Sequence, residues 1–461
     1  MTIAMEDLSK ETLDELLSKA AQSGWLSSLN VQGIDLSGLV SQVPVVTPAR
    51  NEIPREIAGM GSLVAQWEAL LNVNNQQANP AIGVDYAGPL TKFEKTQVFA
   101  PYVPLAQAGR VTQDAIAQAR NYADALAVAE LQVMNQLLIG QDCHIINSQA
   151  YALPAVGIPS TSTSTTTGTI ASGTAVYVAC APRSGINYFY GGSGPAVAGH
   201  ITSGSTTQTN TVTATVAAVQ GAVAYDWFVG TAGTQYYYTT TTVASVTVTF
   251  VPTAAQALPT LPLLSTTAPT TAPTADTSWS ANNYNGIIAS SLGDYGVNAV
   301  VTPGTGVYPS GATFQDNGAS TLTLTGSGIA QLDEVNLALW NSVQLSPTCY
   351  MVNAQQGQDI SEIVLGTSAA TTFLPANDAS ARNALVGGGF LGFYVNRAAG
   401  GSTPIPIVVH PRVAPGTIIA RTDRVPFPGS NIGSVFSVRC QYDTARFDYY
   451  ANYNQIGRAH V

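Results

Sequence analysis

Few side chains in this sequence have the types and the spacing that catalysis needs. A histidine-based triad could draw only on His144, His200 and His410 ahead of the extreme C-terminus, and no neighbouring residue indicates activation of any of them. Acidic pairs that could serve as general acid and base are Asp333 with Glu334, and Asp359 with Glu362. Because both pairs fall in segments typical of surface helix or loop, solvated charge is their default interpretation. We therefore expect no enzyme.

Motifs for nucleotides and metals are absent or out of context. Residues 387–392 (GGGFLG) satisfy GxGxxG, but a nucleotide-binding loop follows a strand and opens a helix, whereas this stretch leads into an apparent strand. The four cysteines form no CxxC pair, and we expect them to be free buried thiols. They are Cys143, Cys180, Cys349 and Cys440. The sequence predicts no catalytic residue, cofactor or metal ion.

The charge composition argues against nucleic-acid binding as the main task. Only 10% of the 461 residues are charged, and the formal net charge is −10. A protein that grips nucleic acid needs clustered Lys and Arg, whereas lysine occurs here only at positions 10, 19, 92 and 95. The sequence shows neither a secretory signal nor an apolar run long enough to span a bilayer. We expect assembly in the cytoplasm and no membrane partner.

The region before residue 112 predicts an arm rather than a core. Residues 1–66 predict a short amphipathic helix over 6–21, and an extended arm interrupted by prolines follows it. Residues 67–111 alternate short β-like pieces with Asn, Gly and Pro, and Thr91–Phe99 alternates as a two-stranded ribbon exposed on both faces would. A lone ribbon is only marginally stable in water, so this extended loop needs a partner.

A long helix is predicted next. Thr112 is a good N-cap, and neither Gly nor Pro interrupts the chain from there to Gly140. Apolar residues recur at helical spacing from Ile116 to Leu138 and form one stripe. Residues 112–160 therefore predict a helix about 40 Å long and the start of a compact domain.

Residues 161–277 differ sharply in composition from the rest of the chain. A Ser/Thr-rich linker opens this block, and a Pro/Thr-rich linker, 254–277, closes it. Its short period-two runs of β-branched and aromatic residues predict an all-β sandwich. The stretch 221–230 (GAVAYDWFVG) resembles the central strand of immunoglobulin-like and fibronectin type III domains. This resemblance makes Tyr225 and Trp227 candidate sandwich core residues.

Residues 278–455 predict a mixed α/β region. Leu332–Val343 is amphipathic, and apolar runs predict strands. The expected strands are Pro347–Asn353, Phe390–Val395, Pro404–Val409 and Thr417–Ala420. Residues 456–461 (IGRAHV) resemble the translated read-through of a common sequencing adapter, so we expect a non-native tail there. The whole chain predicts an α+β fold interrupted by an all-β sandwich.

Taken in order, the arm, the extended loop, the long helix and the later mixed region resemble the major capsid proteins of tailed bacteriophages. This is the Hong Kong 97-type fold. Residues 332–353 (LDEVNLALWNSVQLSPTCYMVN) are similar to the family's passage from the peripheral to the axial domain. Residues 405–425 (IPIVVHPRVAPGTIIARTDRV) resemble its closing strands. The resemblance covers the chain outside residues 161–277, which it treats as an inserted immunoglobulin-like domain.

The resemblance implies an N-terminal arm, an extended loop, a spine helix, and peripheral and axial domains. It implies a virion protein that self-assembles as hexamers and pentamers into an icosahedral shell enclosing double-stranded DNA. Contact with the packaged DNA would be weak and non-specific, given the acidic balance. A separate scaffolding protein and a portal are further implied partners.

Three residues of the extended loop gain a candidate role from the resemblance. In this family the loop reaches onto an adjacent subunit, which makes Lys92, Glu94 and Lys95 candidate intersubunit contacts. In some members a loop lysine forms an isopeptide bond to a neighbouring Asn, whereas intersubunit ion pairs are the simpler interpretation. A different class stays open, namely a surface adhesin or virion decoration protein that recognises its target through the immunoglobulin-like domain.

Overall fold

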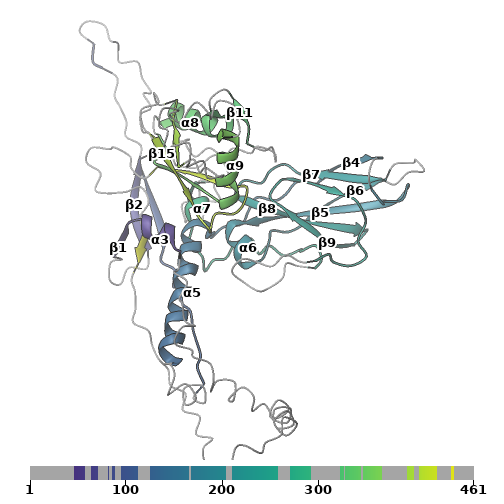
Figure 1. Cartoon of the computed structure of the whole chain (residues 1–461), viewed down its shortest axis with the longest axis horizontal. Helices are drawn as coiled ribbons and strands as arrows, with labels where there is room; N and C mark the ends of the chain where they lie inside the picture. Colours follow the sequence, from purple (N-terminus) through teal and green to yellow (C-terminus); the bar gives the residue numbers. More distant parts are fainter. Residues whose placement is uncertain are drawn as a thin grey trace, which may run out of the picture. The chain divides into compact units, whose positions relative to one another are not determined.

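The computed structural model mixes helices with mainly antiparallel sheets, and its fold is α+β (Figure 1). It describes residues 46–57, 64–70, 81, 86–88, 95–112, 125–165, 168–203, 210–257, 270–291, 322–325, 328–343, 346–365, 392–398, 404–422 and 438–440. The chain divides into two compact units, of which the first combines Met1–Val46 with Gln107–Leu137. The second unit, Thr47–Ala106 with Leu138–Val461, contains every sheet that the structure describes.

A two-stranded ribbon is present, as expected, but its first strand begins at Val64, before the predicted start of the extended loop at residue 67. β2 (Val64–Leu70) pairs antiparallel with β3 (Lys95–Pro101), in a register that sets Val64 opposite Pro101 and Leu70 opposite Lys95. Before the ribbon lie the short helix α3 (Pro48–Glu52), which begins with a proline, and β1 (Arg55–Ile57). β1 pairs in parallel with β17 (Val438–Cys440).

The long helix does not end where the sequence predicted. α5 is described from Ala125 to Asn147, so it continues past Gly140, the expected stop. A glycine ends a helix where the chain must turn left-handed, but here tertiary packing holds the next two turns. Ile145 and Ile146 lie in a buried cluster, and the amide of Ser148 still donates to the carbonyl of His144. The predicted N-terminal part, 113–124, lies outside the described residues.

A four-stranded mixed sheet forms the centre of the later region. Its order is β14 (Phe393–Val395), β15 (Pro404–Val409), β13 (Cys349–Val352) and β16 (Ile418–Arg421). These four strands correspond to the four predicted ones: β13 and β14 are shorter than predicted, β15 has the predicted bounds, and β16 is shifted by one residue. β13 runs parallel to β15 and antiparallel to β16.

Both faces of this sheet are covered by helices. One face packs against α8 (Ala330–Val343) and α9 (Ala354–Leu365), through buried residues such as Leu332, Tyr350 and Ile360. The other face packs against the C-terminal end of α5 and against α3, through Met351, Ile146 and Ala49. The small elements α7 (Ile287–Ser291), β11 (Leu324–Thr325) and β12 (Gly328–Ile329) complete the region.

The charge-poor block folds as two facing sheets. The first has the order β10 (Ser245–Val248), β7 (Thr211–Thr215) and β4 (Ser160–Ser164). The second has the order β6 (Val197–Thr202), β5 (Ala175–Ser184), β8 (Ala222–Thr231) and β9 (Thr234–Thr241), with the short helix α6 (Gly185–Tyr190) after β5. Alternate residues of both sheets, including Val178, Val212 and Trp227, share one buried core.

Both expected linkers of this block are partly structured, which corrects the sequence interpretation. Ser160–Ser164 is a strand, because threonine favours extended backbone and β7 supplies the antiparallel partner strand. In the second segment, Thr271 forms a bridge with Tyr236, and the carbonyl of Thr270 accepts from the amide of Tyr237. A low-complexity composition therefore did not mean an unstructured connection here.

The chain enters and leaves the sandwich at one place. The amide of Leu153 donates to the Ser278 hydroxyl at 3.2 Å, and the amide of Gly286 donates to the Ser148 carbonyl at 2.8 Å. Two segments that lie more than a hundred positions apart in sequence are thus joined by hydrogen bonds. The sandwich has the connectivity of a domain inserted into a loop that follows α5.

Candidate functional site

The candidate contact residues lie on or next to the ribbon. Lys95 is the first residue of β3, where its backbone faces Leu70. Lys92 and Glu94 lie outside the residues that the structure describes, as does the predicted helix 6–21 in the arm. The structure thus places the backbone of Lys95 in the ribbon, and the Lys95 side chain also lies outside the described part.

The structure describes the exposure of only part of the ribbon's side chains, at positions 64–66, 97, 100 and 101. None of the five buried clusters that the structure describes contains a residue of β2 or β3. Among the described ribbon side chains, Ala65 is buried and Ala100 is half-buried, whereas the others are exposed. Two of the exposed side chains lie 3.5 Å apart, between Nε2 of Gln97 and Oε1 of Gln66. An isolated two-stranded ribbon gains little stability from such contacts.

Tyr225 and Trp227 both lie in the core between the two sheets. Their side chains project from β8 into the cluster that joins the sheets, and the Trp227 side chain is fully buried. Each polar tip has a partner, since the Trp227 indole Nε1 donates to Oγ1 of Thr241 at 2.8 Å and the Tyr225 hydroxyl accepts from the Val219 amide at 2.8 Å. Buried aromatic residues with satisfied polar atoms are typical of a structural core.

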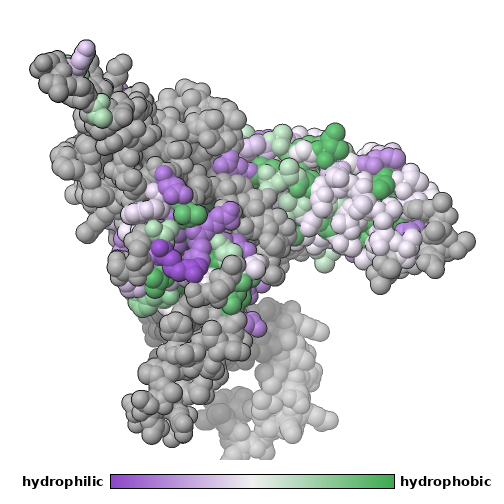
Figure 2. Space-filling view, turned by 90° about the horizontal axis from the view of Figure 1, so that it is seen from above, coloured by the Kyte–Doolittle hydropathy of each residue, from purple (hydrophilic) through white to green (hydrophobic). Residues whose placement is uncertain are grey.

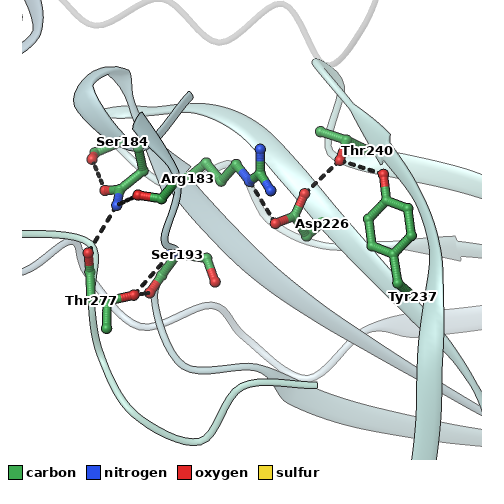
Figure 3. Close-up of polar contacts among 9 residues, drawn as sticks. Arg183, Ser184, Ser193, Asp226, Tyr237, Thr240 and Thr277 are labelled. Atoms are coloured by element: carbon green, nitrogen blue, oxygen red, sulfur yellow. Dashed lines mark hydrogen bonds and ion pairs between the residues drawn. The ribbon is translucent and has the colours of Figure 1, made fainter. Parts of the chain in front are cut away.

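A buried ion pair lies on the opposite face of the same sheet (Figure 3). Nε of Arg183 donates to Oδ2 of Asp226 at 2.6 Å, and both side chains are almost completely inaccessible to solvent. Thr240 donates to Oδ1 of Asp226 and lies 2.8 Å from the Tyr237 hydroxyl. Burial raises the pKa of the Asp226 carboxyl, while the Arg183 guanidinium and the Thr240 hydroxyl oppose this shift.

Sequence reasoning did not single out this pair, although a signal was present. Arg183 and Asp226 are two of the three charged residues between positions 161 and 280. In a block so poor in charge, a charged residue on a predicted strand is rarely buried unless it is paired. The same argument does not find Thr240 or Tyr237, because hydroxyl residues are abundant in the block.

A second buried polar cluster joins three distant segments of the second unit. Oδ2 of Asp142, near the end of α5, lies 3.6 Å from Nε2 of His410, which follows β15. The amide of Ala49 in α3 donates to the same Nε2 at 2.9 Å, and the amide of Arg50 donates to Oδ1 of Asp142 at 3.0 Å. The backbone nitrogen of Arg412 lies 3.1 Å from Nδ1 of His410.

The surroundings of His410 disfavour its protonated form. An imidazolium carries a proton on both nitrogens, yet backbone N–H groups face both nitrogens here. Burial, reinforced by the charges of Arg412 and Arg421, lowers the pKa of His410 to about 4. Burial raises the pKa of Asp142 to about 6, against the opposing effect of the Arg50 amide.

Burial also shifts the pKa values of two neighbouring groups near the end of α5, Cys143 and His144. Burial raises the pKa of the Cys143 thiol to about 12, which leaves it protonated at neutral pH. Burial also lowers the pKa of His144, whose ring lies next to Tyr190 and Tyr284. Across the described ranges, no three His, Cys, Asp or Glu side chains gather as metal ligands would. The two buried polar clusters each connect segments that are separated in sequence.

Comparisons with known proteins add no relative. No protein-family model, no curated protein and no solved structure matches this chain. A separate finding concerns membranes: among the helices that the structure describes, none combines the length and the apolar character needed to cross a bilayer.

Proposed function

We propose that this chain is the major capsid protein of a tailed bacteriophage, a shell protein that assembles from copies of itself around double-stranded DNA. Its mechanism is self-association through large contacts and involves no catalysis. In this proposal the fold is of the Hong Kong 97 type. The ribbon is the extended loop, α5 is the spine helix, and the sheet with α8 and α9 belongs to the peripheral and axial domains.

The observation that carries the proposal is the ribbon. β2 and β3 pair over seven residues each, and both strands carry exposed side chains, Gln66 on β2 and Gln97 on β3 among them. Such a ribbon gains stability when a second molecule covers it. The order of ribbon, long helix and helix-covered sheet along the chain is also the order that the family shows.

The connectivity of the sandwich supports the same proposal. The hydrogen bonds between Leu153 and Ser278 and between Ser148 and Gly286 join the segment that enters the inserted domain to the segment that leaves it. The two parts of the shell region are therefore connected without the sandwich. The sandwich can then serve as a domain added to the shell. A separate scaffolding protein and a portal would complete the assembly.

The intersubunit contacts of the ribbon are proposed to include Lys92, Glu94 and Lys95. Exposed ion pairs are weak one by one, but a shell repeats each of them many times. The net charge of −10 limits the attraction between the inner surface and packaged DNA, so contacts with DNA are weak and non-specific.

A charge-reversal experiment tests this proposal. The double variant Lys92→Glu/Lys95→Glu should shift the purified full chain from large assemblies to small species in sedimentation velocity. The matched control Lys92→Arg/Lys95→Arg keeps both charges and removes the amines that an isopeptide bond needs. Assembly of the control with loss of assembly in the reversal supports ion pairing, whereas a wild-type chain that stays monomeric under all assembly conditions contradicts the proposal.

A further inference from the structure

We propose that neighbouring copies of this chain meet through two different surfaces: the exposed side of β14 (Phe393–Val395) and β15 (Pro404–Val409) in one copy, and the outer side of α8 (Ala330–Val343) in the next. The contact is head-to-tail, because each copy contributes both surfaces. The inference deepens the proposed function, on which it rests, because it names a second contact of the shell region besides the ribbon.

One side of β14 and β15 is exposed. Phe393 lies opposite Pro406 in the register, and side chains directly opposite one another project from the same side of a sheet. Phe393 is 59% exposed and Val395 is 45% exposed, while Pro406 and Val408 are half-buried. This surface, here called the exposed sheet face, consists of Phe393, Val395, Pro404, Pro406 and Val408.

The composition of the exposed sheet face is typical of a covered surface. A sheet with one face in water alternates apolar with polar residues, whereas strands that are covered on both faces are apolar throughout. On their other side, β14 and β15 pack against α8 and α9 through Tyr394, Ile405 and Ile407. In the neighbouring strand β13, Met351 projects to the same side as the exposed sheet face and is covered by α3 and α5. An apolar face that continues beyond such a cover indicates an interaction site.

α8 supplies a second apolar surface, on the other side of the sheet. Leu332 of this helix is buried in the cluster that contains Tyr394. Leu337 is 50% exposed and Trp340 is 37% exposed, and residues three positions apart are neighbours on a helix surface. We call Leu337 and Trp340 the helix patch. Because α8 lies on the opposite side of the sheet from the exposed sheet face, the two surfaces cannot meet within one copy.

A second copy is the partner that fits both surfaces. Each copy carries two different apolar surfaces on opposite sides of one sheet, so a neighbour related by rotation brings its helix patch against the exposed sheet face. Contacts of this head-to-tail kind close into rings when the rotation closes. Such rings are the hexamers and pentamers of the proposed shell. A face-to-face pair would instead leave both helix patches uncovered.

The helix-covered side of the sheet is acidic. Every charged residue of α8 and α9 is an aspartate or a glutamate, namely Asp333, Glu334, Asp359 and Glu362. Arg397 forms an ion pair with Asp333, whereas Glu334 and Glu362 are exposed. Figure 2 shows the sandwich surface as mostly pale, in contrast to a strongly hydrophilic patch elsewhere on the same view, with hydrophobic residues beside it. The strongly charged surface that could orient a neighbour therefore lies outside the sandwich.

The other side of the sheet carries basic residues. α3 and the turn after β15 pack on this side and contribute Arg50 and Arg412, which are both partly exposed. Glu52 of α3 is paired with Arg421 at 3.3 Å. A head-to-tail contact brings the acidic side of one copy toward the basic side of the next, whereas two like sides would repel one another. Charge complementarity therefore favours the same arrangement as the apolar surfaces.

The contact is small and is expected to form together with the ribbon contact. Five residues on one side and two on the other bury less area than a stable dimer of free proteins needs. In a shell, a first contact raises the effective concentration of neighbouring copies for the next one. The contact should therefore appear in assembled particles and be scarce in dilute protein.

Crosslinking between two introduced thiols tests the inference. In the double variant Leu337→Cys/Val395→Cys, the full chain carries one thiol on each surface and keeps Phe393 and Trp340. Assembled particles treated with a short bis-maleimide should give a ladder of dimers, trimers and larger species on a denaturing gel, because each copy is linked to two neighbours. Each single variant should give no more product than the wild type, since no second thiol lies opposite the first.

Two controls complete the crosslinking experiment. The described native cysteines, Cys143, Cys180 and Cys349, are buried, and the wild-type lane measures any background from Cys440. In the matched control, Leu337→Cys is combined with Ile158→Cys, which is 75% exposed and lies on neither surface. This control should give no ladder.

A charge on the exposed sheet face gives an independent measurement. Phe393→Asp should raise the protein concentration needed for assembly by roughly tenfold or more, because the contact would bury an unpaired carboxylate. Since Phe393 is exposed in a single copy, the urea midpoint of this variant should stay close to that of the wild type. Ile158→Asp is the matched control and should assemble like the wild type.

The outcomes separate the inference from the proposed function. Assembled particles in which the double variant gives no ladder above the wild type overturn the contact and leave the shell proposal standing, as would unchanged assembly of Phe393→Asp. Dimers from Val395→Cys alone would show that the exposed sheet face pairs with itself, which overturns the head-to-tail contact. A chain that never assembles contradicts the shell proposal instead.

Discussion

Oδ2 of Asp142 lies 3.6 Å from Nε2 of His410, and both side chains are fully buried. The two residues are far apart in sequence, and the amides of Ala49 and Arg50 in α3 reach the same pair. The pair thus joins the end of the arm, the end of α5 and the turn after β15. Its shifted pKa values make it a sensitive probe of this junction.

The contribution of the Asp142–His410 pair to the free energy of unfolding should be nearly independent of pH between about 4 and 6. Burial lowers the pKa of His410 from 6.5 to about 4, so in this range the unfolded state binds a proton that the folded state lacks. Burial raises the pKa of Asp142 from 3.8 to about 6, so the folded state binds a proton that the unfolded state lacks. The two linkages have opposite signs and cancel.

Single substitutions should reveal the two opposing slopes. In Asp142→Asn, His410 alone of the pair titrates, and its contribution to the free energy of unfolding should rise with pH from about 4 to 6.5, by at most about 1.4 kcal/mol per pH unit. In His410→Gln, Asp142 alone of the pair titrates, and its contribution to the free energy of unfolding should fall as pH rises from 3.8 to about 6. Urea unfolding at several pH values measures both; slopes of the same sign would refute the assignment.

Breaking the Arg183–Asp226 pair should destabilise the sandwich strongly. Asp226→Asn removes the counter-charge of an almost fully buried guanidinium, and loss of one partner of such a pair typically costs about 3 to 5 kcal/mol. The double variant Arg183→Met/Asp226→Leu leaves no buried charge and should unfold at higher urea concentration than Asp226→Asn. A double variant less stable than the single one would show that the pair contributes net stability beyond neutralisation.

Trp227 should contribute more to stability than Trp279. Trp227 is fully buried between the sheets, and truncation of a buried Trp to Ala costs about 3 to 5 kcal/mol. Trp279 is 40% exposed, and the same truncation there should cost clearly less. Comparison of the urea midpoints of Trp227→Ala and Trp279→Ala checks this, and equal losses would argue against the described sandwich core.

A side chain at Gly286 should destabilise the packing of this residue against the C-terminal end of α5. An added Cβ would lie 2.8 to 2.9 Å from the carbonyl oxygens of Ile146, His144 and Ile145, which have little room to move. Gly286→Ala should therefore destabilise the junction by about 1 to 3 kcal/mol, as overpacking does. Gly157→Ala is the matched control, because no atom lies within 4 Å of its added Cβ. Equal melting temperatures for both variants would contradict this geometry.

The sequence predicted periodic elements well and tertiary relationships poorly. The alternation in Pro404–Val409 and the helical spacing in Leu332–Val343 arise within one segment, so a linear pattern reveals them. The predicted end of α5 at Gly140 was wrong, because a glycine stops a helix only when no tertiary contact stabilises the turns that follow it. The strand Ser160–Ser164 was missed because its partner, β7, lies about fifty positions later in the sequence.

The buried clusters were harder to predict for a related reason. Asp142 and His410 come from segments hundreds of positions apart, and neither is unusual in its own surroundings. Only the fold brings them together. Tyr225 and Trp227, by contrast, stand out within a single strand, where an apolar alternation with two aromatic residues predicts which side chains face the core.

Electron microscopy of the purified full-length chain tests the central claim most directly. If the ribbon is covered by neighbouring copies, wild-type protein under assembly conditions should form closed shells or their hexameric and pentameric building blocks. A field of uniform monomers at every concentration and salt condition tried would contradict the proposal that this chain builds a capsid.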